Sequence, residues 1–493
     1  GFINIFFHNI FLIEKLKNII LEDNNYGQNN SGKGLKINIE FVSANPTGPI
    51  HIAHVRGAVY GDVLSNILEK NGYKVIREYY INDAGSQISL LCKSLFIRYQ
   101  QLNGLKVDIK EDEYPGLYLI DIAKEIFAKD KDKWLTINKD ERDKYFKKYA
   151  INRILTSIKN DLNNININFN KFTFETDIIK KNLINDIIKT LKQKNLLYKG
   201  RLKKPKGENN INWKPKTQLL FKSTAFNDDI DRTIQKDNGE WTYFANDAAY
   251  HYDKIQRNFD KLINVWGADH IGYIKRMKSI VEVMSNNKNF LDIQICQIVR
   301  ILKNGKILKM SKRDGDFITL NSIYNKVGKD PLRYYMISKK NETPIDFDLN
   351  KVLEKNKDNP VFYCQYAYAR ASSVINKALN IDKFKEFKNQ KINFDNDNIS
   401  KYEREIILRI LSWPYILNQS SKTKQPHKIV NFIEDLSTSF HSFWNKGKDD
   451  ENLRFIDISN EKKTISKLLW IESMRIILKN AFQIIGIKAL EKM

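Results

Sequence analysis

Apolar and polar residues alternate along Ile37–Phe41 and then recur at helical spacing, which predicts a strand that leads into a helix. The two are separated by Asn45–Pro49, a turn in which Pro lacks a backbone donor and Gly permits tight backbone angles. We expect the helix to begin near His51 and to end at Gly72 as its cap. Its apolar stripe is formed by Ile52, Val55, Val59, Val63 and Ile67.

The same pattern along the rest of the chain predicts an α/β fold followed by a purely helical part. Further strands are expected at Phe2–Phe7, Val75–Ile81, Leu219–Lys222, Trp241–Ala245, Leu262–Trp266 and Ile293–Ile301. Helices are expected at Ile10–Leu21, Leu90–Leu102 and Leu117–Phe127 and from Asp247 onward. The Asn-Gly pair within Lys303–Lys306 predicts a hairpin turn. After Pro360, four apolar stripes at helical spacing predict a helical bundle.

The length and the net charge of the chain limit the classes of protein to which it can belong. A chain of 493 residues with 42% hydrophobic residues is expected to form two or three domains. Its net charge of +24 favours a polyanionic partner such as RNA or DNA, although the abundance of Asn, Ile and Lys indicates that codon bias contributes. No uninterrupted apolar run reaches membrane-spanning length. Three isolated cysteines exclude a disulfide framework and a Cys-rich zinc site, so we expect a cytoplasmic protein.

Two histidines near the expected helix start are the first candidates for chemistry. His51 and His54 are three residues apart and therefore share a face at the helix N-terminus, where unpaired N–H groups suit a phosphate. Taken by themselves, two such histidines are more often ordinary surface or core residues. A zinc site would need further ligands, which are absent nearby. Far downstream, Lys309–Arg313 reads KMSKR and supplies clustered positive charge between Gly305 and Gly315.

Together these two segments resemble the signatures of class I aminoacyl-tRNA synthetases. His51-Ile52-Ala53-His54 resembles the HIGH motif, and Lys309–Arg313 matches the KMSKR motif in the same order and at a suitable separation. The resemblance implies that the carboxylate of an amino acid attacks the α-phosphorus of ATP and that pyrophosphate leaves. His51, His54, Lys309 and Lys312 would then stabilise charge on the phosphate oxygens.

Acidic residues beside expected strand ends point to a cationic amino acid. Glu40, Asp247 and Asp269 all lie there, and a guanidinium binds planar carboxylates well, although each acid alone is also a common cap or ion-pair partner. Longer segments resemble arginyl-tRNA synthetases of the bacterial type over essentially the whole chain. They are SANPTGPIHIAHVRGAVYGDVL, REYYINDAGSQI, YFANDAAYHYDK, WGADHIGYIKRM, NPVFYCQYAYARASSV and GIKALEKM.

This resemblance implies a site and its ligands. Arginine would be held by Glu40, Ser43, Asn45, Tyr243, Asp247, Asp269 and His270. ATP would contact Gly48, Pro49, Ala53, Met310 and Ser311 and would bring Mg²⁺, with no metal ligated by the protein. The resemblance further implies that tRNA(Arg) must bind before arginine is activated and that its terminal 2′-hydroxyl accepts the amino acid. Ala53 replaces the usual Gly of HIGH, and we expect ATP binding to tolerate the extra methyl group.

The resemblance also implies a domain order. Residues 1–35 are expected to be a remnant of an N-terminal domain that recognises the tRNA elbow, followed by a linker. Residues 36–355 would form a Rossmann-like (HUP-type) parallel-sheet catalytic domain with an insertion at about 88–215. Residues 356–493 would form an all-α helical-bundle anticodon-binding domain. We expect a monomer. The alternatives are another class I aminoacyl-tRNA synthetase, a nucleotidyltransferase with a similar helix start, and a non-catalytic tRNA-binding paralogue.

Overall fold

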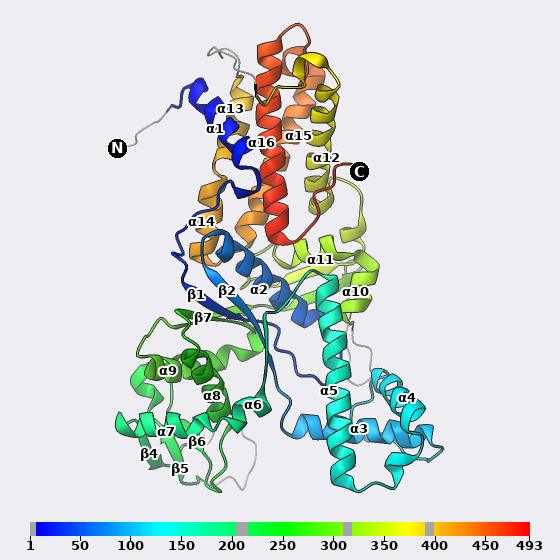
Figure 1. Cartoon of the computed structure of the whole chain (residues 1–493), viewed down its shortest axis with the longest axis vertical. Helices are drawn as coiled ribbons and strands as arrows, with labels where there is room; N and C mark the ends of the chain where they lie inside the picture. The colour runs from blue at the N-terminus through cyan, green and yellow to red at the C-terminus, as the bar shows by residue number, and fades with distance from the viewer. Residues whose placement is uncertain (1–5, 204–214, 309–317, 390–398) are drawn as a thin grey trace.

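The computed structural model of the chain describes residues 6–203, 215–308, 318–389 and 399–493. Its long axis runs from a bundle of helices, through a central sheet, to two separate lobes (Figure 1). Within the described residues the central sheet has five parallel strands in the order β3-β2-β1-β7-β8. Their bounds are Lys36–Glu40 (β1), Lys74–Ile81 (β2), Lys171–Phe174 (β3), Lys261–Gly267 (β7) and Leu291–Cys296 (β8). The expected Rossmann-like sheet is confirmed, and the carboxyl ends of its strands share one edge.

Helix α2 (Ile52–Lys70) connects β1 to β2 and brings its N-terminus to that edge. The apolar stripe expected from the sequence is fully buried. Gly61 allows the helix to approach β1 closely, because a Cβ there would lie 2.3 Å from the ring of Phe41. Gly72 has a φ of +82°, which lets the chain turn from the helix into β2 at little steric cost.

Two lobes are inserted between strands of the sheet (Figure 1). The first lies between β2 and β3 and contains α3 (Ser86–Leu102), α4 (Tyr118–Asp130) and α5 (Lys139–Asn164). The second lies between β3 and β7 and contains α6 (Glu175–Lys180), α7 (Leu183–Gln193), β4 (Leu197–Gly200), β5 (Gln218–Phe221), β6 (Arg232–Gln235) and α8 (Tyr243–Gln256). Helix α9 (Ile274–Ser285), after β7, shares the second lobe's hydrophobic cluster. The range 88–215, expected to be one insertion, thus contains a strand of the main sheet.

Two expected strands have a different structure. Trp241–Ala245 is not a strand, because α8 begins at Tyr243 and the hydroxyl of Thr242 accepts a hydrogen bond from the Ala245 amide. Ile293–Ile301 is not one strand but the end of β8 and the start of β9 (Val299–Lys303), which lie in different sheets. Strand β9 pairs with β10 (Lys306–Ile307) and β11 (Ile345–Asp348). The predicted hairpin turn joins β9 to β10, with φ angles of 51° at Asn304 and 73° at Gly305.

The C-terminal part is a helical bundle, as predicted. After α10 (Leu320–Val327) and α11 (Lys329–Met336), it comprises α12 (Pro360–Leu379), α13 (Lys401–Leu411), α14 (Trp413–Thr423), α15 (His427–Asp449) and α16 (Glu461–Ile485). Helix α1 (Asn9–Glu22) packs on α16, where the Ser473 hydroxyl donates to the Leu16 carbonyl at 3.1 Å. The expected strand Phe2–Phe7 falls largely on residues 1–5, outside the described part, and Phe6 and Phe7 belong to no strand.

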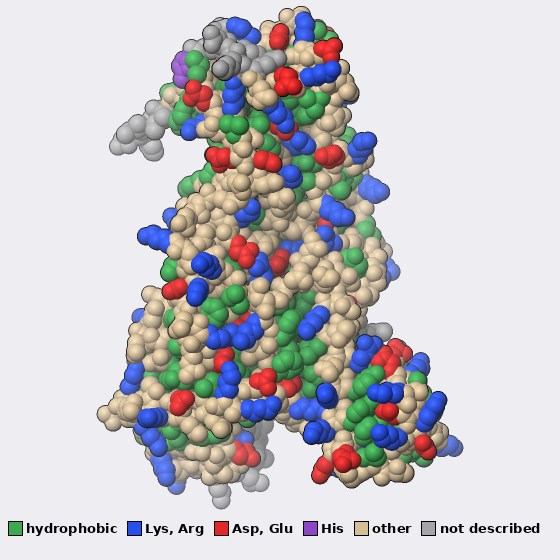
Figure 2. Space-filling model, viewed as in Figure 1, with side chains coloured by type: hydrophobic (Ala, Val, Ile, Leu, Met, Phe, Trp, Pro, Cys, Tyr) green, Lys and Arg blue, Asp and Glu red, His purple; other side chains and the backbone are tan. Residues whose placement is uncertain are grey.

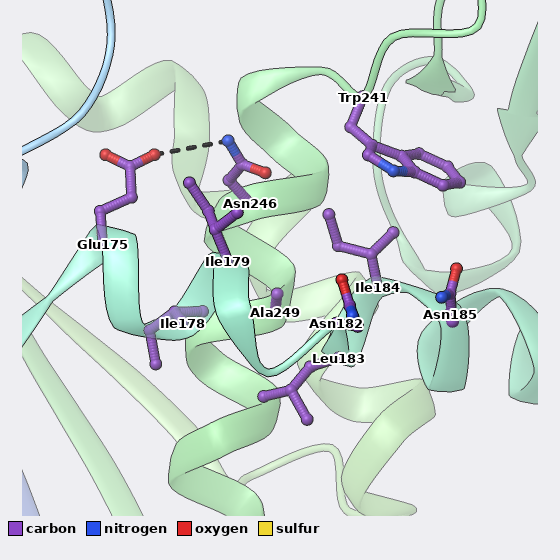
Figure 3. Close-up of a pocket in the computed structure, with 10 residues that line it drawn as sticks. All are labelled: Glu175, Ile178, Ile179, Asn182, Leu183, Ile184, Asn185, Trp241, Asn246 and Ala249. Carbon is purple, nitrogen blue, oxygen red and sulfur yellow. Dashed lines mark hydrogen bonds between the residues drawn. The ribbon is translucent and has the colours of Figure 1, made fainter.

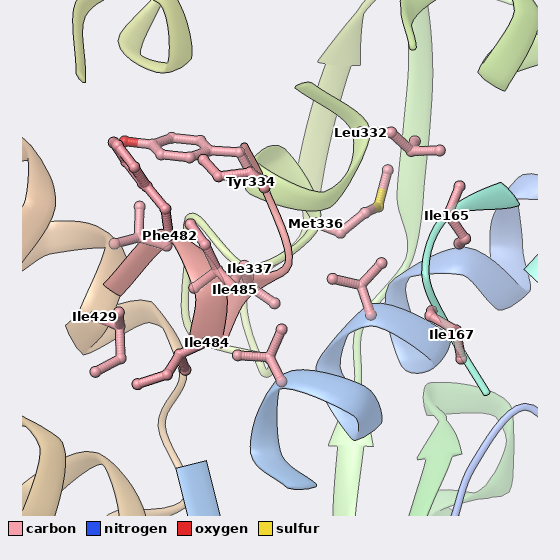
Figure 4. Close-up of a cluster of buried hydrophobic side chains, with 14 of the residues drawn as sticks. Ile165, Ile167, Leu332, Tyr334, Met336, Ile337, Ile429, Phe482, Ile484 and Ile485 are labelled. Carbon is pink, nitrogen blue, oxygen red and sulfur yellow. The ribbon is translucent and has the colours of Figure 1, made fainter. Parts of the chain in front are cut away.

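The bundle and the sheet domain share one hydrophobic core. Figure 4 shows the junction, where side chains from α11, from the end of α16 and from the segment after α5 meet. In the described part of the chain, no helix combines the length and the apolar character needed to cross a membrane.

Candidate active site

The N-terminus of α2 presents the two histidines at the sheet edge. His51 is the N-cap residue, and the ring centroids of His51 and His54 are 4.0 Å apart. Burial, followed by the neighbouring His51, lowers the pKa of His54 to about 4, so this imidazole is neutral at physiological pH. Its Nδ1 atom is buried and has no hydrogen-bond partner among the described residues. A neutral imidazole can donate one ring N–H to a phosphate oxygen.

The chain after the KMSKR segment returns to this helix end. Lys309, Met310, Ser311 and Lys312 lie outside the described residues. Just beyond them, however, Leu320 donates to the Ile50 carbonyl at 2.8 Å, and the Ile52 amide donates to the Ile318 carbonyl at 3.2 Å. Thr319 forms a β-bridge with His51. The described chain that resumes at Ile318 therefore passes directly beside His51.

The turn from β1 into α2 has a constrained backbone. Val42 and Ser43 both have positive φ angles, 67° and 40°, which are uncommon for residues other than Gly. The Ser43 hydroxyl fixes this conformation, because it donates to Glu40 at 3.1 Å and accepts from the Tyr80 amide at 3.1 Å. Asn45, also expected at the site, is exposed and donates from Nδ2 to Gln87 at 2.8 Å.

The residues expected to contact ATP lie farther along this segment. Gly48 and Pro49 are half-buried, and Ala53 is exposed on the first turn of α2. A Cβ on Gly48 would lie 3.3 Å from the hydroxyl of Tyr118, so this glycine leaves room for an α4 side chain next to the turn. The Tyr118 hydroxyl also donates a hydrogen bond to the Thr47 carbonyl. Helix α4 of the first lobe thus packs against the turn between β1 and α2.

Glu40, at the end of β1, is already paired. Its Oε2 lies 2.5 Å from Nζ of Lys254, a side chain with no solvent exposure on α8. The same ammonium also contacts Oδ1 of Asn264 on β7 at 3.4 Å. Sequence reasoning missed Lys254, although it lies in the quoted segment YFANDAAYHYDK. The charge of Glu40 is therefore compensated from within the protein.

Asp247 differs from Glu40 in its electrostatic surroundings. It lies one turn after the exposed Tyr243 on α8 and forms no ion pair within the described residues. Burial, together with the nearby Glu175 and Glu40, raises its pKa to about 7, and Arg276 offsets this rise only in part. In such surroundings, an added cation would strongly stabilise the ionised form of the carboxyl group.

Glu175 and Asp83 lie near Glu40 and Asp247, and these four acids form a cluster that was not predicted from the sequence. Tyr80 lies among Glu175, Asp247, Glu40 and Asp83, and burial followed by these carboxylates raises its pKa. Asp83 accepts hydrogen bonds from the amide and hydroxyl of Thr176 at 2.9 and 2.6 Å. The cluster thus gathers groups from the ends of β1, β2 and β3 and from α8, and a cation would relieve its mutual repulsion.

Asp269 and His270 lie beyond β7, in the short 3₁₀ helix Ala268–Tyr273. They contact each other at 3.5 Å, and their side chains are 79% and 57% exposed. Asp269 is close enough to raise the pKa of His54 slightly against the larger effect of burial. The structure thus brings this loop to the histidine end of the site.

A second set of functional groups, mostly half-buried, lies on the helical bundle, and sequence reasoning missed it. The guanidinium of Arg370 lies 4.1 Å from the ring centroid of Tyr366 and 4.8 Å from that of Trp444. His441 packs against Tyr363 at 4.3 Å and contacts Arg370 at 3.2 Å. A partly exposed mixture of aromatic rings and a guanidinium is typical of surfaces that stack on unpaired nucleobases.

Comparisons with known proteins agree across the whole chain. Residues 15–356 match the family model of tRNA synthetases class I (R), catalytic domain, and residues 364–493 match the DALR anticodon binding domain. The arginine–tRNA ligase of Pelagibacter ubique is 44% identical over 502 residues, covering 100% of this chain and 85% of that protein. The arginine–tRNA ligase of Ehrlichia chaffeensis is 42% identical over 465 residues, covering 94% and 80%.

Solved structures give the same picture. A structure assigned as an arginyl-tRNA synthetase from Campylobacter jejuni superposes with a TM-score of 0.84 at 30% identity, covering 98% of this chain and 99% of that one. The arginyl-tRNA synthetase of Thermus thermophilus superposes with a TM-score of 0.73 at 18% identity, covering 97% and 86%, which supports the fold alone.

Proposed function

Because the chain belongs to the arginyl-tRNA synthetases, class I enzymes that join arginine to tRNA(Arg) at the expense of ATP, we propose how its residues divide this work. The N-terminus of α2 and the segment 309–313 hold ATP. The acidic cluster at the ends of β1, β2 and β3 holds the guanidinium of arginine. The observation that carries this assignment is Asp247, a half-buried carboxyl group near Glu175 and Glu40 with a pKa of about 7.

In the first step, the arginine carboxylate attacks the α-phosphorus of ATP, the bond to the bridging oxygen breaks, and pyrophosphate leaves. His51 and His54 donate hydrogen bonds to phosphate oxygens, while Lys309 and Lys312 balance the charge of the leaving pyrophosphate. Gly48, Pro49, Ala53, Met310 and Ser311 contact the nucleotide. We propose that Mg²⁺ arrives with ATP and is held by its phosphates.

Arginine enters with its guanidinium towards Asp247. Tyr243, one turn earlier on α8, closes over the side chain, and Asn45 with Asp269 or His270 contacts the α-amino and carboxylate end. For Glu40 we propose a role other than the direct contact with arginine that the resemblance implies. Its pairing with Lys254 supports a role in shaping and charging the cavity, with Ser43 as the connecting hydrogen bond.

In the second step, the terminal 2′-hydroxyl of tRNA(Arg) attacks the carbonyl of arginyl-adenylate and AMP leaves. We propose that the surface of Tyr363, Tyr366 and Arg370 stacks on anticodon bases. Lys and Arg side chains are spread along the face shown in Figure 2, from the bundle to both lobes, which supports a long contact with a polyanion. We further propose that tRNA is required for arginine activation and that the enzyme acts as a cytoplasmic monomer.

ATP–pyrophosphate exchange with each amino acid, with and without tRNA(Arg), tests this function. We expect exchange with arginine only, and only when tRNA is present. Asp247→Asn should weaken arginine binding by about 2–4 kcal/mol, the scale for removing one partner of a desolvated charge pair. Exchange with a different amino acid would overturn the arginine assignment. Absence of exchange with every amino acid would favour a non-catalytic tRNA-binding role.

A further inference from the structure

Helix α8 directs polar side chains at two different parts of the molecule. Figure 3 shows one of its faces, where Asn246 donates from Nδ2 to Glu175 at 3.4 Å beside the pocket between α6 and α8. Asp247, His251 and Lys254 do not line that pocket. Their spacing of four and then three residues places them along another face of the helix, which is directed at β1 and β7.

A hydrogen-bonded network on this second face is formed by the side chains of His251, Asn264, Lys254 and Glu40. Nδ1 of His251 lies 2.8 Å from the carbonyl oxygen of Asp247, one helical turn earlier, and Nε2 lies 2.8 Å from Nδ2 of Asn264 on β7. Oδ1 of Asn264 accepts from Nζ of Lys254 at 3.4 Å, and the same ammonium pairs with Glu40 at 2.5 Å. All four side chains are buried, with at most 6% of any of them exposed. The His251–Glu40 network thus runs from α8 to the end of β1 through the protein interior.

The direction of each hydrogen bond in the His251–Glu40 network is fixed. A carbonyl oxygen only accepts, so Nδ1 of His251 carries the ring hydrogen and Nε2 accepts from Nδ2 of Asn264. The opposite orientation of the Asn264 amide would place an N–H group against the ammonium of Lys254, two donors without an acceptor. The network is therefore complete only when His251 is neutral and protonated at Nδ1. Burial, followed by the nearby Lys254, lowers the pKa of His251 to about 4, which agrees with a neutral ring.

The network ends at the turn that leads into the nucleotide site. The other oxygen of Glu40, Oε1, accepts from the Ser43 hydroxyl at 3.1 Å, and this hydroxyl accepts from the Tyr80 amide at 3.1 Å. Ser43 has a φ of 40°, a backbone conformation that persists only where surrounding contacts hold it. By fixing the carboxylate of Glu40, Lys254 thus also fixes the turn between β1 and α2. The His251–Glu40 network therefore connects Asp247 of the arginine site with the backbone that enters α2.

Resting on the function proposed above, we propose that His251 and Asn264 are positioning residues for the activation of arginine. They hold Lys254 on Glu40 and so keep the arginine site on α8 in a fixed position relative to the nucleotide turn. Attack of the arginine carboxylate on the α-phosphorus depends on this alignment, and a displacement of about 1 Å can slow such a step about 10²-fold. The carboxylate of Asp247 takes no part in the network. Loss of the network therefore lowers kcat and leaves the KM for arginine nearly unchanged.

Two matched substitutions of His251 separate the two ends of its ring. His251→Gln places an oxygen near the position of Nε2 and can still accept from Asn264, whereas His251→Asn can reach the Asp247 carbonyl but not Asn264. In ATP–pyrophosphate exchange with tRNA(Arg) present, His251→Asn should lower kcat about 10–100-fold, and His251→Gln should stay within about threefold of the unmodified chain. The KM for arginine should change less than about threefold in both. Equal losses of kcat in the two variants, or a change in the KM for arginine alone, would overturn the proposal.

A double-variant cycle tests whether His251 acts through Asn264. Asn264→Ala should lower kcat at least as much as His251→Asn. Adding His251→Asn to Asn264→Ala should then slow the reaction by no more than about a further threefold, because the network is already broken. If the two losses multiply instead, the residues act independently and His251 does not position the site through Asn264.

Nuclear magnetic resonance of the full chain with isotope-labelled histidine tests the network without catalysis and without relying on a destabilised variant. The ring of His251, identified by the loss of its signals in His251→Gln, should be the neutral Nδ1–H tautomer from about pH 6 to about pH 8. Lys254 on α8 opposes protonation of this ring, and Glu40 on β1 and Glu78 on β2 favour it less strongly than burial opposes it. An Nε2–H tautomer or an imidazolium would refute the inference whatever the rates. The expected tautomer in a chain that shows no exchange with arginine would instead refute the proposed function and, with it, the positioning role.

Discussion

His54 combines a buried, unpartnered ring nitrogen with a pKa of about 4. Since we assign this neutral ring to a phosphate oxygen, His54→Ala should slow arginine-dependent exchange by about 10²–10³-fold, as loss of one transition-state donor does elsewhere. Arginine affinity, measured by titration, should change little. His8→Ala is the matched control, because His8 is exposed at the distant start of α1. A large loss of arginine affinity with an unchanged rate would assign His54 to the amino acid instead.

Asp247 should make arginine binding depend on pH. Its pKa of about 7 in the free protein means that the carboxyl group is increasingly neutral below pH 7 and cannot then pair with a guanidinium. The value of kcat/KM for arginine should therefore rise as pH increases through about 7. Asp247→Asn should lack this rise, and a profile of the same shape in the variant would show that another group titrates.

The same carboxyl group should lower the stability of the fold. An acid whose pKa is higher in the folded than in the unfolded chain destabilises the fold once it is ionised, and this effect is lost as pH falls through the folded value. At pH 8, Asp247→Asn should therefore raise the free energy of unfolding by about 1–3 kcal/mol. Chemical denaturation at pH 8 and pH 5 measures this, and the gain should shrink at pH 5. A variant that is less stable at pH 8 would contradict the burial argument.

At the residue scale, the acids within the segments that resemble arginyl-tRNA synthetases could be identified from the sequence. The charged groups that surround each acid could not. Asp247 and Glu40 were expected, yet one is uncompensated and the other is paired with Lys254. Glu175 was missed, because it follows a four-residue strand too short for its alternation to be recognised. Whether a carboxylate is free or paired depends on contacts between distant segments, which periodicity does not report.

At the element scale, Arg56 connects α2 to the segments that precede and follow the KMSKR region. The side chain is 1% exposed and donates to the carbonyls of Gln297 at 2.9 Å and Lys340 at 2.7 Å. Arg56→Ala should destabilise the fold by about 3 kcal/mol through the loss of these charge-assisted bonds. It should also raise the KM for ATP more than that for arginine. Arg56→Lys, which can retain one carbonyl contact, should recover part of both effects, and equal changes in the two KM values would argue against this positioning role.

The elements that the sequence predicted correctly are long or strongly periodic, such as α2 and α16. Those that it missed are short or ambiguous. Trp241–Ala245 contains Trp, Thr, Tyr and Phe, which favour strands, but the Thr242 cap and the packing of Phe244 in the second lobe's core make it a helix start. Ile293–Ile301 reads as one apolar run, yet its chain leaves the main sheet after Cys296 and enters another at Val299. The local pattern of apolar residues does not indicate where the chain leaves one sheet and enters another.

At the scale of the whole molecule, the helical bundle is less separate than its sequence suggests. Helices α1 and α2, which flank β1, both contact α16, so the catalytic sheet and the bundle bury one continuous core. Asn66 of α2 donates to the Ile484 carbonyl at the end of α16 at 2.8 Å. The bundle is therefore in direct contact with α2, the helix whose N-terminus carries His51 and His54.

Arg333 on α11 is the most buried connection in this junction. It is fully buried and donates to the Ile485 carbonyl at 2.8 Å and the Ile165 carbonyl at 2.7 Å, and it pairs with Asp62 on α2 at 2.5 Å. Arg333→Met leaves Asp62 without this partner and frees both carbonyls. We expect a loss of about 3–5 kcal/mol in the free energy of unfolding, the cost of breaking a buried ion pair from one side.

Denaturation in urea, followed by fluorescence and circular dichroism, measures this loss, and both signals should shift together because the core is shared. Arg300→Met is the matched control. Arg300 makes a bidentate pair with Asp346 at 2.6 and 3.0 Å, but both side chains are nearly half exposed, so its loss should cost less than about 1 kcal/mol. Replacing Asp62 by Leu in the Arg333→Met background should restore part of the stability, because it removes a buried carboxylate that retains only the longer contact with Arg77 at 3.7 Å. If the two arginine variants are equally stable, the junction at Arg333 does not hold the bundle to the sheet.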